Sequence, residues 1–229
     1  MSQLPLSVGL AATFSFDNYV AGLNAQALAA VRALSEATGP RLLYLWGRPG
    51  TGKSHLAQAV CQRINQRGAR GAFIPLNGGN AITPALLDGL EHVALVCIDD
   101  LQCVVGNDAW EKALFNLYNE TEHTQTRLLL TGTMSLAAAA FSLPDLRSRL
   151  TSGLAFQLRE LGDSEREAAV QLRAHERGFE IPQEVVDYLM RRYPRSMHEL
   201  ISLVEKLDHL TLSQHRRVTI PFVKSLLDT

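Results

Sequence analysis

The sequence predicts an α/β protein with a five-stranded parallel sheet flanked by helices, followed by a smaller part made of helices only. Short apolar runs alternate with amphipathic segments along the first part of the chain, which is the pattern of a helix-covered parallel sheet. After about Leu161 the pattern becomes helical throughout. We therefore expect an α/β subdomain at residues 13–161 and a helical subdomain at 162–229, preceded by a flexible tail at 1–12.

The individual elements follow from hydrophobic periodicity and from helix start signals. Apolar runs suited to buried strands occupy residues 41–46, 71–76, 93–98, 127–130 and the region near 154–158. Helical patterns occupy 24–37 with Asn24 as the N-cap, the residues from Ser54 to about Arg67, 83–91 and 108–123. In the last part, Ser164 with Glu167 and Ser196 with Glu199 form capping boxes, and Pro182 and Pro221 each start a helix.

Composition excludes several classes of protein. The net charge of the 229 residues is -1, so the whole molecule has no positive field with which to hold nucleic acid. Apolar runs reach six residues, far short of a membrane span, and no basic residue precedes Arg32, as a secretory signal would require. The three cysteines lack metal-ligand spacing. We expect reduced thiols and a cytoplasmic protein.

A glycine-rich loop, Gly47 to Ser54, follows the first expected strand and has the pattern G-x-x-x-x-G-K-S. Glycines let backbone N–H groups wrap a phosphate, Lys53 reaches the outer phosphates, and the Ser54 hydroxyl is a Mg²⁺ ligand. The following helix points its positive end at the same anion. The loop predicts ADP or ATP binding with Mg²⁺ through Gly47, Pro49, Gly50, Thr51, Gly52, Lys53 and Ser54.

Two adjacent carboxylates, Asp99 and Asp100, end the third expected strand. Ligands of open α/β sheets lie just beyond the carboxyl ends of the strands. P-loop proteins need an acid on the Mg²⁺ side and a polar group that orients water. We assign Asp99 to the metal, together with Ser54, and Asp100 to the polarisation of water.

These segments resemble the AAA+ ATPases, and within them the DnaA family of bacterial replication initiators. The stretch 16–24 (FDNYVAGLN) resembles the segment that lines the adenine pocket of DnaA, which adds Tyr19 to the nucleotide-binding residues. Residues 98–102 (IDDLQ) resemble its Walker B stretch, and residues 146–150 (LRSRL) resemble its arginine-finger box. The resemblance covers about residues 14–229 and implies an AAA+ core with a helical lid.

The expected layout narrows the resemblance. DnaA continues into a helix-turn-helix domain that reads DNA, whereas this chain stops at Thr229, within or just after the lid, and starts with a short tail. That arrangement resembles the Hda family, the DnaA-related regulatory inactivators, as do residues 206–208 and 219–224. The resemblance implies a partner, DnaA, and only indirect contact with DNA.

The tail supports the same interpretation. Residues Gln3, Leu4, Pro5 and Leu6 resemble the short motif that binds the DNA polymerase III β sliding clamp. Two leucines of an extended peptide fit an apolar cleft, the Gln3 amide hydrogen-bonds beside it, and Pro5 lowers the ordering cost.

Two positions depart from the DnaA pattern. The sensor 1 region, 129–133, supplies the Thr133 hydroxyl where relatives often carry a carboxylate or an amide. In the sensor 2 stretch, His198 replaces an arginine, and a largely neutral imidazole lacks the arginine fork. Either the grip on the γ-phosphate is weakened, or Arg195 substitutes for His198.

Arg149 is therefore the expected catalytic arginine, acting as a finger in trans on ATP held by DnaA, with Arg147 as the close alternative. The resulting prediction is an adaptor that links DnaA to the sliding clamp, stimulates hydrolysis of DnaA-bound ATP and so prevents re-initiation. The alternatives are an autonomous AAA+ ATPase, such as a helicase-loader-like motor, and a small-molecule kinase. The sequence leaves open ADP or ATP as the resident nucleotide, the chain's own ATPase activity, and whether it forms a homodimer.

Overall fold

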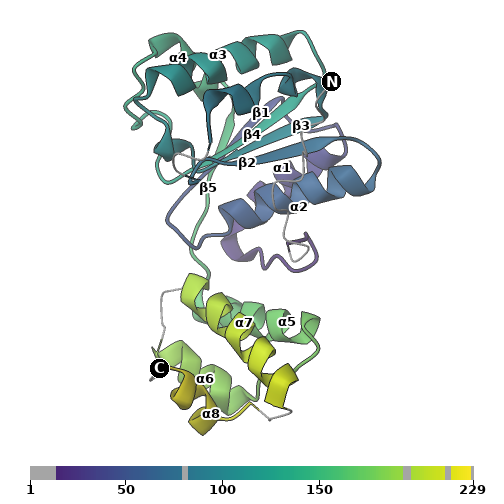
Figure 1. The fold of residues 1–229 in the computed structure, drawn as a ribbon, viewed down its shortest axis with the longest axis vertical. Coiled ribbons are helices and arrows are strands. Elements are labelled where there is room, and N and C mark those ends of the chain that lie inside the picture. The colour runs from purple at the N-terminus through teal and green to yellow at the C-terminus, as the bar shows by residue number, and fades with distance from the viewer. Residues whose placement is uncertain (1–13, 79–81, 193–196, 215–217, 228–229) are drawn as a thin grey trace. The chain divides into compact units, whose positions relative to one another are not determined.

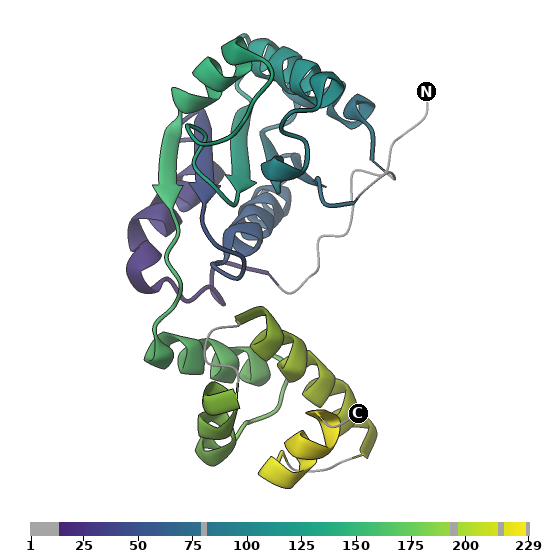
Figure 2. The ribbon, with the colours of Figure 1, turned by 90° about the vertical axis from the view of Figure 1, so that its left-hand side faces the viewer.

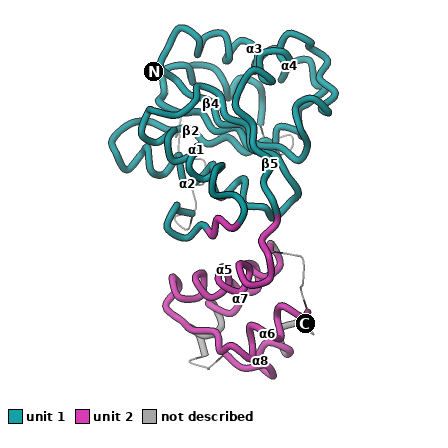
Figure 3. Tube along the Cα trace, turned by 180° about the vertical axis from the view of Figure 1, so that it is seen from behind, with its two compact units in different colours: residues 1–19, 23–159 teal, residues 20–22, 160–229 magenta. Residues whose placement is uncertain are grey.

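The computed structural model describes residues 14–78, 82–192, 197–214 and 218–227, and for residues 198, 209–214 and 225–227 it describes the backbone only. The chain divides into two compact units (Figure 3). One contains the segment up to Tyr19 and residues 23–159, and the other contains residues 20–22 and 160–229. The expected tail, 1–12, lies outside the described residues.

Five parallel strands form one sheet in the order β2-β3-β4-β1-β5. Each lies where an apolar run predicts it, with bounds shifted by one or two residues. Because all strands are parallel, their carboxyl ends meet at one edge, where a ligand site of this fold class belongs. The strands are β1 (Leu42–Trp46), β2 (Gly71–Pro75), β3 (Leu95–Asp99), β4 (Arg127–Gly132) and β5 (Leu154–Gln157).

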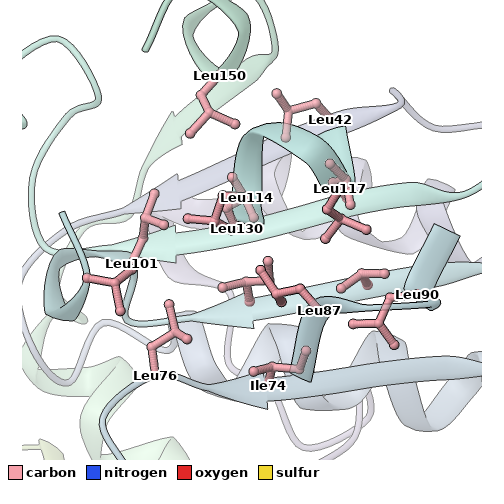
Figure 4. Close-up of a cluster of buried hydrophobic side chains, with 14 of the residues drawn as sticks. Leu42, Ile74, Leu76, Leu87, Leu90, Leu101, Leu114, Leu117, Leu130 and Leu150 are labelled. Atoms are coloured by element: carbon pink, nitrogen blue, oxygen red, sulfur yellow. The ribbon is translucent and has the colours of Figure 1, made fainter. Parts of the chain in front are cut away.

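Helices cover both faces of the sheet, as Figures 1 and 2 show. Successive strand residues point to opposite faces, and in β1 to β4 both faces are buried, which explains why these strands read as continuous apolar runs, whereas β5 at the edge is largely exposed. In β1, Leu43 and Leu45 join the core under α1 and α2, while Leu42 and Tyr44 join the core under α3 and α4. Figure 4 shows part of the core under α3 and α4. The helices are α1 (Ala25–Ser35), α2 (Lys53–Gln66), α3 (Asp108–Glu122) and α4 (Pro144–Thr151).

The helix expected at 83–91 is wrong. Two short 3₁₀ helices occupy the segment, η3 (Pro84–Leu87) and η4 (Leu90–His92). Gly89 separates them with a left-handed φ of 78°, which an α-helix cannot contain. Leu87 and Leu90 are buried against α3, so tertiary packing rather than a regular period places them.

The sequence predicted that the Asn24 side chain caps α1, but it makes no cap hydrogen bond. Its amide bonds instead to the backbone of Arg159: Nδ2 donates to the carbonyl oxygen over 2.9 Å, and Oδ1 accepts from the N–H over 2.7 Å. Two bonds to one distant peptide outweigh the single bond of a cap. Helix α4 was not predicted, because its eight residues are too few for a clear period.

The second unit contains α5 (Asp163–Glu176), α6 (Gln183–Arg192), α7 (Met197–Gln214) and α8 (Ile220–Leu227) around its own apolar core. Helices begin at Pro182 and near Pro221 as expected. The capping box expected at Ser164 and Glu167 is wrong, because the N-cap of α5 is Gly162, two residues earlier, and Glu165 Oε2 accepts from the Gly162 N–H over 2.6 Å. Ser196 lies outside the described residues.

None of the helices in the described part of the chain combines the length and the apolar character that crossing a membrane takes.

Candidate functional site

The loop between β1 and α2 has a backbone that only glycine adopts without strain. Gly47, Gly50 and Gly52 have φ values of 153°, 80° and 91°. A Cβ on Gly47 would lie 2.6 Å from the carbonyl oxygen of Leu158, and a Cβ on Gly52 would lie 2.7 Å from the ring of Tyr19. Gly52 is also the N-cap residue of α2, so no side chain of the N-cap covers the positive N-terminal end of that helix.

Lys53 lies inside this loop and is nearly fully buried. Its Nζ donates to the carbonyl oxygens of Gly47 and Arg48, each over 2.9 Å, and Thr51 Oγ1 donates to the same Arg48 oxygen over 2.9 Å. Burial lowers the pKa of Lys53, and the nearby aspartates act in the opposite direction. The ammonium group therefore organises the loop and carries a buried positive charge toward the acids at the end of β3. Pro49, by contrast, is exposed at the tip of the loop.

Asp99 ends β3 and is almost fully buried. Its Oδ1 accepts a hydrogen bond of 2.5 Å from Thr131 Oγ1, and Ser54 provides a second hydroxyl bond. Burial raises the pKa of Asp99 above its ordinary value, whereas the two hydroxyl bonds lower it. The structure thus brings together Ser54 and Asp99, the two residues that the sequence assigned to Mg²⁺.

Thr131 was missed by the sequence analysis, which singled out Thr133 in the same segment. The register of the sheet explains the correct choice: β3 and β4 are neighbours, and Ile98 pairs with Leu130, so the next residues, Asp99 and Thr131, lie level. Thr133 contributes its backbone N–H instead, which donates to Gln102 Oε1 over 3.2 Å. Strand order is the signal that could have found Thr131, and it is not readable from one strand alone.

Asp100 has a left-handed backbone, with φ 63° and ψ 49°, which is uncommon for residues other than glycine, although asparagine and aspartate adopt it more often than most. Such strain concentrates at functional sites, where surrounding contacts hold it. Its N–H donates to Thr131 Oγ1 over 3.1 Å, and its two carboxylate oxygens accept from Asn77 Nδ2 over 3.1 Å and from Gln102 Nε2 over 2.9 Å. Asn77 follows β2 and Gln102 lies in η5 (Leu101–Cys103), and neither was predicted.

Tyr19 lies at the other end of the loop, beside Gly52 and edge-on to the ring of His55 at 5.2 Å. Burial raises its pKa to about 12. His55 lies in the first turn of α2, and its Nε2 donates to the Ser15 carbonyl oxygen over 2.9 Å, since a carbonyl only accepts. The segment around Tyr19 is thus fixed against the start of α2, next to the glycine loop.

Arg149 lies in α4, away from these residues in sequence, and contacts α3. Its Nη1 is 3.0 Å from Glu122 Oε2, and its guanidinium carbon lies 5.7 Å and 5.4 Å from the ring centres of Phe115 and Tyr118. Arg147 Nη2 donates to the carbonyl oxygen of Ala137 over 2.8 Å. Both arginines are partly or fully exposed on α4.

Several expected residues lie outside what the structure describes. Residues 3–6 and Arg195 are not described, and His198 belongs to α7 without a described side chain. Within the described residues, no group of three or more histidine, cysteine, aspartate and glutamate side chains could hold a metal ion. The three cysteines are free thiols, two buried and one exposed.

Comparison with known proteins adds two family matches. Residues 10–76 match the family of the bacterial DnaA ATPase domain, and residues 163–227 match the Hda lid domain.

Solved structures with a similar fold include domain III of the Thermotoga maritima replication initiation protein DnaA, at 21% identity and a TM-score of 0.81, covering 96% of this chain and 98% of that one. AMPPCP-bound DnaA from Aquifex aeolicus has a TM-score of 0.73 at 23% identity, covering 88% and 67%. The Thermotoga maritima RuvB Holliday junction branch migration motor has a TM-score of 0.67 at 20% identity, covering 94% and 71%. The predicted fold, an AAA+ core with a small helical lid, is confirmed.

Proposed function

We propose that this chain, an AAA+ protein related to DnaA and Hda, regulates replication initiation by stimulating hydrolysis of ATP bound to DnaA. In this proposal the chain also links DnaA to the sliding clamp, and the stimulated hydrolysis prevents re-initiation. It acts in the cytoplasm and contacts DNA only through these two partners, which agrees with its net charge of -1.

The observation that carries the proposal is the combination of two matches in one chain. The first part matches the ATPase domain of DnaA and the last part matches the lid of Hda. An arginine finger can be supplied in trans by a second protein, so a DnaA-type core with Arg149 partly exposed on α4 suits contact with ATP on a neighbouring subunit.

The residues present fit a bound nucleotide with Mg²⁺. Gly47 and Gly52 let the loop backbone turn close to Leu158 and Tyr19, where a Cβ would clash, and Lys53 supplies a buried positive charge within the loop. Ser54 and Asp99 supply a hydroxyl and a carboxylate, both oxygen ligands that Mg²⁺ accepts. The ion neutralises phosphate charge when bound. We assign ADP or ATP to this loop, with Tyr19 as a further contact, and the assignment of His198 to the nucleotide stays a prediction from the sequence.

Arg149 is the residue that we assign to the stimulated reaction. A guanidinium stabilises charge that develops on the transferred phosphoryl group, and it does so from a neighbouring subunit in many NTPases of this class. Arg147 stays the alternative on the same helix, and its guanidinium donates to the carbonyl oxygen of Ala137.

A second candidate function, an autonomous ATPase, is favoured by the complete set formed by Lys53, Asp99 and Asp100. Against it, the sequence carries Thr133 and His198 at the two sensor positions, where the DnaA pattern has a carboxylate or an amide and an arginine. Turnover by the isolated protein separates the two: a kcat of about 1 s⁻¹ or more, within the usual enzyme range, favours the autonomous ATPase.

The decisive experiment mixes purified protein, DNA-loaded clamp and ATP-loaded DnaA, and follows ATP turnover. Wild type should accelerate hydrolysis, and Arg149→Ala should lose at least tenfold of the stimulation, since arginine fingers contribute about 10³ or more. Arg147→Ala serves as the matched control on the same helix. If Arg149→Ala stimulates as well as wild type, the assignment in trans is refuted.

The clamp contact has its own test. Clamp capture should fall sharply in the double variant Gln3→Ala with Leu4→Ala, because these residues supply the amide and one apolar anchor of the tail. Binding that is undiminished would refute the role of residues 3–6 while leaving the role of Arg149 intact.

A further inference from the structure

The Arg149 side chain contacts a stripe of three residues on one face of α3, which we call the seat of Arg149. Phe115, Tyr118 and Glu122 follow one another at spacings of three and four residues, so they share one face of the helix. Helix α4 lies alongside α3 (Figure 1), and all three side chains of the stripe contact the Arg149 guanidinium. The contacts are of two chemical kinds, and they act on the arginine differently.

The two rings attract the guanidinium through their π faces. A cation–π contact uses the charge of the arginine and none of its N–H donors. Phe115 and Tyr118 therefore limit where the guanidinium lies while leaving its donors available for hydrogen bonds to phosphate oxygens.

Glu122 acts in the opposite sense. Its carboxylate oxygen lies 3.0 Å from Nη1, so it occupies a donor and neutralises the charge that a phosphate would attract. The arginine has five N–H donors in a fixed fork, and bidentate recognition of a phosphate needs two neighbouring ones. A carboxylate and a phosphate thus compete for the same group.

The ion pair between Arg149 and Glu122 is weak enough for a phosphate to replace the carboxylate. The two side chains remain 39% and 42% exposed, and ion pairs between exposed groups are weak. The end of α3 does not depend on Arg149, because the Arg41 guanidinium donates to the backbone carbonyl oxygens of Thr121 and Glu122 at the negative end of the helix dipole.

We propose that Glu122 restrains Arg149 in the free protein, and that the phosphate of a partner-bound nucleotide displaces Glu122 while Tyr118 keeps the guanidinium in place. This inference rests on the proposed function, because it assigns the regulation of the same arginine. Tyr118 and Glu122 are positioning residues, and only Arg149 touches the reacting phosphate.

The test uses the assay with DNA-loaded clamp and ATP-loaded DnaA, with this protein below saturation. Glu122→Gln should raise the stimulated rate by about two- to fivefold, the factor that corresponds to an exposed ion pair. Glu120→Gln is the matched control, because it removes the same charge from an exposed position on the same helix. Tyr118→Leu should lower the rate by about two- to fivefold, while Tyr118→Phe, which keeps the ring, should not.

A rise in one variant and a fall in the other cannot come from loss of structure alone. In the isolated protein, NMR of the Arg149 guanidinium should show faster rotation about the Nε–Cζ bond in Glu122→Gln than in Glu120→Gln. Equal rates of stimulation for these two variants, or a fall in Glu122→Gln, would overturn the restraint while leaving the proposed function standing. A wild type that does not stimulate would refute the proposed function and the restraint with it.

Discussion

Replacing Thr131 by valine tests whether its hydroxyl couples the two acids of the site. Valine has nearly the same shape, so the apolar packing at the end of β4 is kept. The variant removes a donor to Asp99 and an acceptor for the N–H of Asp100. Thr131 is fully buried, so water has no direct route to replace the hydroxyl.

The expected loss of stability follows from the two bonds. A hydrogen bond to a charged, buried carboxylate contributes about 1.5–3 kcal/mol, and the partly exposed N–H of Asp100 adds about 0.5–1 kcal/mol. We therefore expect the free energy of unfolding to fall by about 2–4 kcal/mol near neutral pH. Thr131→Ser keeps the hydroxyl and should lose less, and Thr133→Val makes the same chemical change two residues away.

The loss should also depend on pH. Burial raises the pKa of Asp99 in the folded chain, so folding loses stability as pH rises from the ordinary aspartate range through that raised pKa. The Thr131 bond lowers this pKa, and valine lets it rise further. The difference between wild type and Thr131→Val should therefore be larger at about pH 8 than at about pH 4.

Urea denaturation at the two pH values, followed by circular dichroism, measures this difference. A change of less than about 0.5 kcal/mol at both pH values, or a difference that shrinks as pH rises, would refute the coupling through Thr131.

Three further outcomes are expected. Ala37 has a left-handed φ of 55° after α1, so Ala37→Gly should raise the free energy of unfolding by about 0.5–1 kcal/mol in urea titrations, and a decrease would contradict the strain. Glu111 is buried and accepts from the backbone N–H groups of Gly106, Ser142 and Leu143, so Glu111→Ala should cost about 3–5 kcal/mol by the same measurement, whereas Glu120→Ala should be nearly neutral. Burial raises the pKa of Tyr19 and of Tyr44 to about 12, so absorbance titration should show two tyrosines that ionise late. The free energy of unfolding should fall as pH rises from about 10 through 12. Ionisation of all tyrosines near pH 10 in the folded protein would contradict this.

The fold could be predicted because its signals are local. Strands β1 to β4 are apolar runs, as burial on both faces of a parallel sheet requires, and the glycine loop identifies the first crossover to a helix. The prediction of a helix at 83–91 was wrong because leucines spaced at helical intervals also suit two short 3₁₀ helices. The left-handed backbone of Gly89 excludes the single α-helix. The predicted Asn24 cap was wrong for a related reason. A cap is a local bond, whereas the Asn24 amide bonds to Arg159, 135 residues away.

The candidate site divides along the same line. Lys53, Ser54, Asp99 and Asp100 could be identified because a motif or a strand end contains them. Thr131 could not, because its role depends on strand order and register, which join segments that are not neighbours in sequence. The seat of Arg149 is likewise a contact between two helices, and the short α4 has too weak a period to be predicted.

The partners of the two charged groups proposed for hydrolysis differ in kind, and this difference has a functional consequence. Asp100 is held by the neutral amides of Asn77 and Gln102, which fix its carboxylate without cancelling its charge. Arg149 is held by the carboxylate of Glu122, which cancels its charge. A group held by neutral partners needs no exchange to act, whereas a group held by its counter-ion acts only after a stronger anion replaces that ion. In the proposed function, a nucleoside triphosphate on a neighbouring subunit is such an anion, so we expect Arg149 to act only within that complex.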